Sequence, residues 1–132
     1  MKLSNLCLLA LGHFNSVAAC FIALRNNYEV VLTTHLSSKS IDLFNIDFTK
    51  SIALVFGNEH SGVSNEANAL ADGNFIIPQM GIIQSLNISV ACAVTIYEAY
   101  RQKSLAGHYE KSTMPEPQMQ SLRKQWGFDK NI

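Results

Sequence analysis

Apolar side chains recur at helical spacing in two long parts of the chain. Between residues 14 and 25 they return every three or four positions, and Asn15 and Ser16 are both residue types that can cap the start of this helix. The longest such stretch runs from Ser85 to about Leu105, and Gly107 follows it as a stop signal. Residues 88–97 are apolar almost all the way round, so we expect this helix to be buried on most sides.

Three shorter runs have the composition of β-strands. Residues 28–34 are rich in β-branched side chains, residues 51–56 form a continuous apolar run, and residues 74–77 end at a proline. The run at 51–56 suits a strand that is buried on both faces. The segment from 35 to 50 is polar apart from a short apolar patch at 41–44, and the predicted order has no strand there.

Two further helices complete the predicted order. Ser64 can cap a short helix that ends near Ala71, and Pro115 and Pro117 mark a linker before a terminal helix. The terminal helix carries an apolar stripe at positions i, i+3 and i+7 (Met119, Leu122 and Trp126). Because helices and strands alternate along the chain, the sequence predicts an α/β fold with a mostly parallel sheet and helices on both faces.

The composition indicates one folded domain, and its balanced total charge is the sum of an acidic body and a basic C-terminal region. The 132 residues are 48% apolar, with ten basic and ten acidic side chains, which is unlike a disordered chain. Residues 1–99 hold four basic and seven acidic side chains, whereas residues 100–132 hold six and three. Basic residues could therefore form a phosphate-binding surface near the C-terminus, or simply a solvated tail (Arg101, Lys103, Lys111, Arg123, Lys124 and Lys130).

The cysteines and histidines indicate the cellular compartment and argue against disulfides and a metal site. Three widely spaced cysteines with no C-x-x-C pair indicate a reducing, cytoplasmic setting rather than a disulfide framework. The four histidines are scattered, so we expect no metal site.

No run of about 18 apolar residues is present, so no membrane span is expected. The apolar start of the chain is short and has one preceding charge, which favours a buried strand or helix end over a targeting signal.

Two loops have the position of a ligand site. The loops 57–64 and 77–89 each follow a predicted strand and precede a helix, which is where open α/β sheets bind ligands. Glu59, Ser85 and Asn87 place a carboxylate, a hydroxyl and an amide there. Known nucleotide and esterase signatures do not fit, because the chain has no G-x-G-x-x-G or G-x-S-x-G and no lysine after its P-loop-like glycine spacing.

The same two loops resemble a known family. Residues 54–64 (Leu-Val-Phe-Gly-Asn-Glu-His-Ser-Gly-Val-Ser) and 76–91 (Ile-Ile-Pro-Gln-Met-Gly-Ile-Ile-Gln-Ser-Leu-Asn-Ile-Ser-Val-Ala) are similar to motifs two and three of the SpoU branch of the SPOUT RNA 2′-O-ribose methyltransferases. The wider similarity, from about Tyr28 to Tyr109, points toward the tRNA guanosine-18 2′-O-methyltransferases.

The resemblance implies a C-terminal trefoil knot, a homodimer, and S-adenosylmethionine bound by the loops of the knot. The residues at the family's cofactor-contacting positions are Thr34, Gly57, Ile77, Gly81, Leu86 and Asn87. Glu59, Ser85 and Asn87 take the places of the family's catalytic polar residues, and Arg101 and Lys103 are candidates for contacting RNA. Without the resemblance, Thr34 and Ile77 could be ordinary strand ends, and Ser85 and Asn87 ordinary helix caps.

The implied reaction is transfer of a methyl group to a ribose 2′-oxygen of RNA, most readily a D-loop guanosine of tRNA. In this family an arginine in an Asn-rich first motif activates the hydroxyl, and residues 1–132 hold no such motif. We therefore expect residues 1–106 to be an N-terminally truncated methyltransferase domain and residues 107–132 a basic extension with a short helix. The alternatives are a non-catalytic remnant that binds cofactor or RNA, and a dimeric scaffold of the same fold.

Overall fold

The computed structural model describes residues 12–58, 60–80, 86–112 and 114–125. The elements in chain order are α1 (Val17–Arg25), β1 (Val30–Thr34), β2 (Ile41–Asp42), the 3-10 helix η1 (Leu43–Asn45), β3 (Ile52–Val55), α2 (Asn65–Leu70), β4 (Gly73–Ile76), α3 (Ile88–Leu105) and α4 (Glu116–Gln125).

The four strands form one sheet in the order β2-β4-β1-β3, and every pairing is parallel. β1 lies between β3 and β4, with Thr33 opposite Val55 and Thr34 opposite Phe75. The α/β prediction with a parallel sheet is therefore confirmed. In a parallel sheet all strands point the same way, so the carboxyl ends of β4, β1 and β3 are neighbours.

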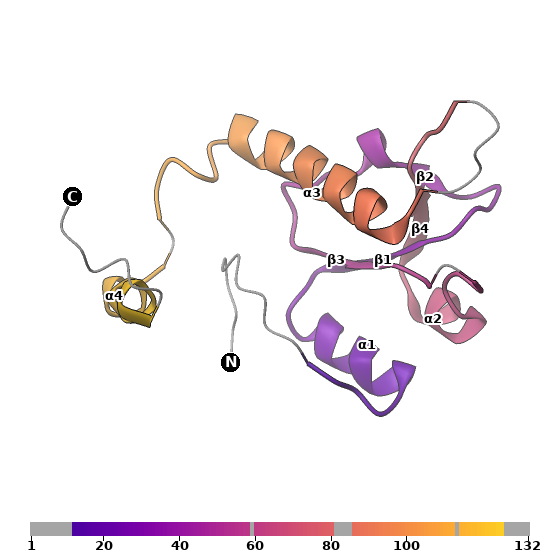
Figure 1. The fold of residues 1–132 in the computed structure, drawn as a ribbon, viewed down its shortest axis with the longest axis horizontal. Coiled ribbons are helices and arrows are strands. Elements are labelled where there is room, and N and C mark those ends of the chain that lie inside the picture. The colour runs from indigo at the N-terminus through magenta and orange to yellow at the C-terminus, as the bar shows by residue number, and fades with distance from the viewer. Residues whose placement is uncertain (1–11, 59, 81–85, 113, 126–132) are drawn as a thin grey trace.

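The alternation of side chains along β1 divides the core into two layers. Val31 packs with Phe21 of α1 and Ala67 of α2 on one face of the sheet. Leu32 points the other way and packs with Phe75, which is fully buried, and with residues of the η1 segment. Figure 1 shows α1 and α2 on one side of the sheet and α3 on the other, as expected for helices on both faces.

The two short helices begin at the residues that the sequence predicts. The Ser16 hydroxyl accepts a hydrogen bond from the Ala19 amide, and the Ser64 hydroxyl accepts one from the Ala67 amide. These caps satisfy amides that a helix start leaves without intrahelical partners.

An ion pair joins the ends of α1 and α2 to the sheet. Arg25 donates to the Asp72 carboxylate at 3.0 Å and to the Leu70 carbonyl at 2.6 Å. The other Asp72 oxygen accepts the Val31 amide at 2.8 Å. Asp72 thus satisfies an amide at the start of β1 while it fixes the last residue of α1.

α3 departs from the expected burial. Only Thr95 and Glu98 are buried, and α3 presents six large apolar side chains to solvent (Val90, Val94, Ile96, Tyr97, Tyr100 and Leu105). The expectation of a helix buried on most sides is wrong for this single chain. Periodicity records which residues are apolar, whereas the sheet and η1 cover only one side of the helix.

Three local details also differ from the sequence prediction. The patch at 41–44 contributes β2 and part of η1, where the predicted order has no strand. β4 begins at Gly73, one residue before the predicted strand at 74–77, because Gly73 pairs with Leu32. Pro117 lies in the first turn of α4, a position where a helix tolerates proline because the first amides lack intrahelical partners.

A buried carboxylate attaches α3 to the segment after η1. Glu98 accepts two 2.8 Å hydrogen bonds from Arg101 and one from the Gln102 side chain. Gln102 also donates to the Ile46 carbonyl and accepts the Phe48 amide, both at 2.9 Å. The hydrogen bonds from Arg101, followed by that from Gln102, lower the pKa of Glu98 from 4.5 to about 2, although burial acts in the opposite direction.

α3 ends where the backbone turns left-handed at Gly107, with φ +75°. The Gly107 amide donates to the Ser104 carbonyl and the His108 amide to the Lys103 carbonyl, a pattern that closes helices at glycine. The predicted stop is confirmed. α4 follows after a short segment and, in Figure 1, lies away from the sheet.

The structure bears on three of the exclusions made from the sequence. No helix in the described part of the chain is long and apolar enough to cross a membrane. Among the same residues, no group of histidine, cysteine or acidic side chains could hold a metal ion, and Cys20 and Cys92 are free. The trefoil knot and the division at residue 106 stay predictions.

The Glu98 network predicts an acid-sensitive stability. The folded-state pKa of Glu98 lies below its ordinary value, so its stabilisation is present above pH 4.5 and is lost as the pH falls toward 2. Urea unfolding of the parent chain and of Glu98→Gln gives the free energy of unfolding of each at several values between pH 7 and pH 2.5. We expect the variant to be less stable at pH 7 and to lose less stability on acidification.

The matched control is Glu29→Gln, which removes a carboxylate from an exposed position. This control should keep the acid dependence of the parent. Equal acid dependence in the parent and in Glu98→Gln would contradict the assignment.

Candidate functional site

The structure brings three of the predicted site residues to one edge of the sheet. Thr34 is the last residue of β1, Gly57 follows β3 by two positions, and Ile77 directly follows β4. The Thr34 hydroxyl lies 3.5 Å from the Val55 carbonyl oxygen, and Thr34 pairs with Phe75. These contacts place the ends of three adjacent strands at the same level, so Thr34, Gly57 and Ile77 can face one ligand.

The loop after β3 is a closed hairpin. The Asn58 amide donates to the Gly62 carbonyl at 3.2 Å, and the Gly62 amide donates to the Asn58 carbonyl at 3.0 Å. Gly62 has φ +67°, a conformation that favours glycine. A Cβ atom on Gly57 would lie 2.0 Å from the Gly62 carbonyl carbon, so the hairpin closes only over a residue without a side chain.

The side chain of Asn58 forms a second set of contacts in this loop. Its carbonyl oxygen accepts hydrogen bonds from the His60 amide at 3.0 Å, the Ser61 amide at 2.7 Å and the Ser61 hydroxyl at 3.0 Å. Asn58 is not among the site residues predicted from the sequence. The sequence signal for this role is an asparagine in a loop that follows an apolar strand and is bounded by two glycines. Asparagine side chains often accept a hydrogen bond from the backbone amide two residues ahead, and this stabilises such a loop.

The loop after β1 is also fixed by polar side chains. Asn74 accepts hydrogen bonds from the Ser37 hydroxyl at 3.1 Å and from the Ser40 hydroxyl at 2.7 Å. Ser40 also lies 2.6 Å from the His35 carbonyl oxygen. This network, which the sequence analysis missed, holds the segment after Thr34 against β4. A serine-rich run after a strand was its only sequence signal.

The remaining site residues lie at the start of α3 or outside the described residues. Leu86 is half-buried, and Asn87 is the N-cap of α3, with its side-chain oxygen accepting the Ser89 amide at 2.8 Å. Asn87 therefore caps the helix, which is the alternative that the sequence left open, and a cap can also face a ligand. Glu59, Gly81 and Ser85 lie outside the described residues.

The two residues predicted to contact RNA lie toward the other end of α3. Arg101 follows Asn87 by 14 positions, which is about 20 Å along a helix. Its guanidinium is engaged by the Glu98 carboxylate, which raises the pKa of Arg101. Lys103 is half-buried in the last turn, where a positive charge is favourable near the helix C-terminus.

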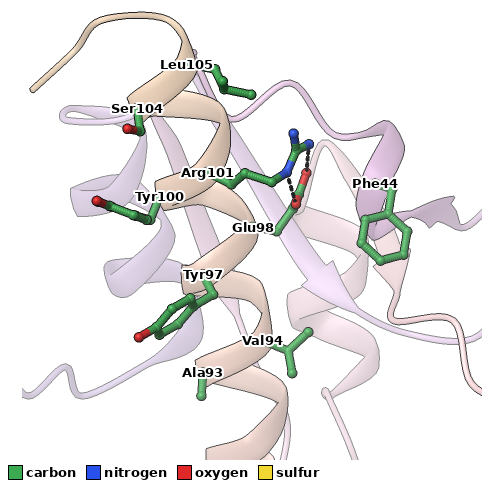
Figure 2. Close-up of a pocket in the computed structure, with 9 residues that line it drawn as sticks. All are labelled: Phe44, Ala93, Val94, Tyr97, Glu98, Tyr100, Arg101, Ser104 and Leu105. Carbon is green, nitrogen blue, oxygen red and sulfur yellow. Dashed lines mark hydrogen bonds and ion pairs between the residues drawn. The ribbon is translucent and has the colours of Figure 1, made fainter.

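An apolar groove of about 700 Å³ runs along α3, apart from the strand ends. Figure 2 shows Val94 and the Glu98–Arg101 pair on the side of α3 that faces Phe44, and Tyr97 and Tyr100 on the opposite side. Apart from the carboxylate, which Arg101 and Gln102 bind, the lining is largely hydrocarbon and aromatic. Such a surface suits contact with another apolar surface better than the binding of a polar substrate.

The comparison with known proteins decides the family. The model of the SpoU rRNA Methylase family matches residues 2–97, which is most of the chain. The chain belongs to the SpoU rRNA methylase family. The resemblance seen in the two loops is thereby confirmed.

Two of the relatives in the SpoU family have the same name, which is that of a tRNA methyltransferase. The tRNA (guanosine(18)-2'-O)-methyltransferase of Escherichia coli strain K12 is 45% identical over 100 residues, which is 74% of this chain and 44% of the relative. The enzyme of the same name from Aquifex aeolicus is 38% identical over 105 residues, or 80% of this chain and 50% of the relative. The chain thus spans about half the length of these curated relatives.

Solved SpoU-family structures support the fold. The A. aeolicus TrmH/SpoU tRNA modifying enzyme superposes with a TM-score of 0.76 at 34% identity, covering 90% of this chain and 60% of that chain. The SpoU methyltransferase AviRb from Streptomyces viridochromogenes, solved in complex with the cofactor AdoMet, gives a TM-score of 0.52 at 38% identity. That likeness covers 56% of this chain and 29% of AviRb.

Proposed function

We propose that this chain is the S-adenosylmethionine-binding part of an RNA 2′-O-ribose methyltransferase that acts on a guanosine in the D-loop of tRNA. The observation that carries the proposal is the meeting of three parallel strand ends around a glycine hairpin. The family membership and the names of the relatives support the substrate. We further propose that it acts in the cytoplasm.

The residues at the strand ends fit an adenosine-bearing cofactor. Thr34 and Ile77 at the strand ends, and Leu86 just before α3, are each half-buried, so each has surface left for a ligand. Ile77 packs against the same core layer as Phe75, which limits its movement. The backbone of Gly62 and Val63 fills the space where a side chain of residue 57 would lie, so the absence of a side chain at Gly57 lets the hairpin close beside the strand ends.

When bound, S-adenosylmethionine supplies an electrophilic methyl group. A ribose hydroxyl is a weak nucleophile at neutral pH, so the reaction needs precise orientation and removal of a proton. We propose that Thr34, Ile77 and Leu86 hold the cofactor and that Gly57 and Gly81 shape its loops. Asn87, Glu59 and Ser85 are our candidates for orienting the ribose and handling its proton.

The RNA contact is proposed for the basic C-terminal region. Lys111, Arg123 and Lys124 are exposed, and the last two follow one another on α4. Arg101 and Lys103 remain candidates on α3, although the Glu98 carboxylate offsets the charge of Arg101. Phosphate contacts of this kind would make RNA binding weaken as the salt concentration rises.

We also propose that the chain forms a homodimer and a C-terminal trefoil knot. The dimer is supported by the apolar groove along α3, which is lined by Phe44, Val94 and Leu105, all three of them exposed. Exposed apolar surface of this kind is uncommon on monomers. The knot rests on the resemblance of the two loops to the SpoU family, to which the chain belongs.

The dimer proposal predicts a mass. Sedimentation equilibrium should give a particle of twice the 14.6 kDa chain mass. Val94→Asp, which places a carboxylate in the groove, should shift the particle toward 14.6 kDa, because an unpaired charge is costly in an apolar interface. Ile22→Asp is the control, since Ile22 is exposed on α1. A parent chain that sediments at 14.6 kDa would overturn the dimer.

The cofactor proposal predicts a specific loss of binding. Calorimetric titration of the chain with S-adenosylhomocysteine should show binding, and Leu86→Arg should weaken it by at least ~10-fold, because a long cation would enter an apolar contact. Leu122→Arg is a matched control, since Leu122 is also half-buried but lies on α4. It should bind like the parent.

The outcomes separate the competing functions. No binding heat from the parent would remove the cofactor function and leave a scaffold of the same fold. Binding without methyl transfer to unmodified tRNA would favour the non-catalytic remnant. Binding together with transfer would establish the enzyme.

A further inference from the structure

The conformation of the loop after β3 depends more on the Asn58 side chain than on packing. His60, Ser61 and Gly62 are all exposed, so burial contributes little to their conformation. Two backbone amides and one hydroxyl instead converge on the Asn58 side-chain oxygen, at 2.7 to 3.0 Å. The oxygen therefore supplies an internal partner for amides that would otherwise bond water in an open loop.

The backbone hairpin needs this support. The two hydrogen bonds between Asn58 and Gly62 close a turn that passes directly over Gly57. The turn also requires a left-handed residue at Gly62, and glycine loses much conformational entropy when it is ordered. An isolated bridge in an exposed loop opens readily unless further contacts offset that entropy.

We propose that Asn58 is a positioning residue for the cofactor: its side-chain oxygen maintains the Asn58–Gly62 pairing beside Gly57, in the shape that receives S-adenosylmethionine. The inference rests on the proposed function, because Gly57 in this loop is a predicted cofactor contact. A loop that is closed beforehand does not lose conformational entropy when the ligand binds. Asn58 acts through the backbone and need not touch the cofactor itself.

The variant Asn58→Ala tests the inference by separating affinity from stability. It removes the acceptor from an exposed loop, so the chain should remain folded. We expect its Kd for S-adenosylhomocysteine to rise about 10-fold, with a less favourable binding entropy, because the loop must then close during binding. Asn58→Asp keeps an oxygen in place and should bind within about threefold of the parent.

The chain offers a matched control on the opposite edge of the sheet. Asp47 accepts hydrogen bonds from the Thr49 amide at 3.1 Å and the Thr49 hydroxyl at 2.5 Å, the same kind of turn, in the loop that precedes β3. Asp47→Ala should lower the melting temperature about as much as Asn58→Ala does, yet leave the Kd unchanged.

Each result has one meaning. A parent that binds and an Asn58→Ala variant with unchanged Kd would overturn the inference and leave the proposed function standing. Equal losses in Asn58→Ala and Asn58→Asp would overturn the role of the oxygen. A parent that does not bind S-adenosylhomocysteine would overturn the proposed function and, with it, the inference.

Discussion

The parallel pairing of β1 with both β3 and β4 is the constraint on which the site depends. Because Thr33 lies opposite Val55 and Thr34 opposite Phe75, the chain leaves all three strands at the same edge. Strand pairing alone therefore brings together residues that are far apart in the sequence, and these residues need not contact one another. The hairpin over Gly57 and the Asn74 network complete this edge by fixing the two loops that leave β3 and β1.

The two faces of the sheet are stabilised differently. On one face, α1 and α2 pack on Val31 and are tied to it through Arg25 and Asp72. On the other face, α3 is attached through Gln102 and the buried Glu98, which leaves its apolar outer side exposed. This asymmetry is what makes a second copy of the chain a reasonable partner for α3, at a distance from the strand ends.

Local patterns predicted the fold well where short-range physics decides it. The caps at Ser16 and Ser64 and the stop at Gly107 follow from hydrogen bonds within a few residues of the chain. β2 was missed because it has two residues and exists only through pairing with β4, more than 30 positions away. Exposure of α3 could not be predicted either, since composition does not say what covers a helix.

The candidate site was predicted in a similar, partial way. The loops after strands indicated where a ligand site lies, and the family resemblance supplied Thr34, Gly57 and Ile77, which the sheet places together. The support from Asn58 and Asn74 depends on turn geometry and on contacts across the sheet edge, which hydrophobic patterning does not encode. Glu59, Gly81 and Ser85 stay predictions from the resemblance.

Amide chemical shifts of the ¹⁵N-labelled chain, recorded during titration with S-adenosylhomocysteine, show which residues the cofactor contacts. If the strand ends form the cofactor site, the largest changes will be at the amides of Thr34, Gly57 and Ile77, with α4 unaffected. Changes confined to the groove along α3, around Tyr97 and Leu105, would rule out a cofactor site at the strand ends, as would the absence of any change.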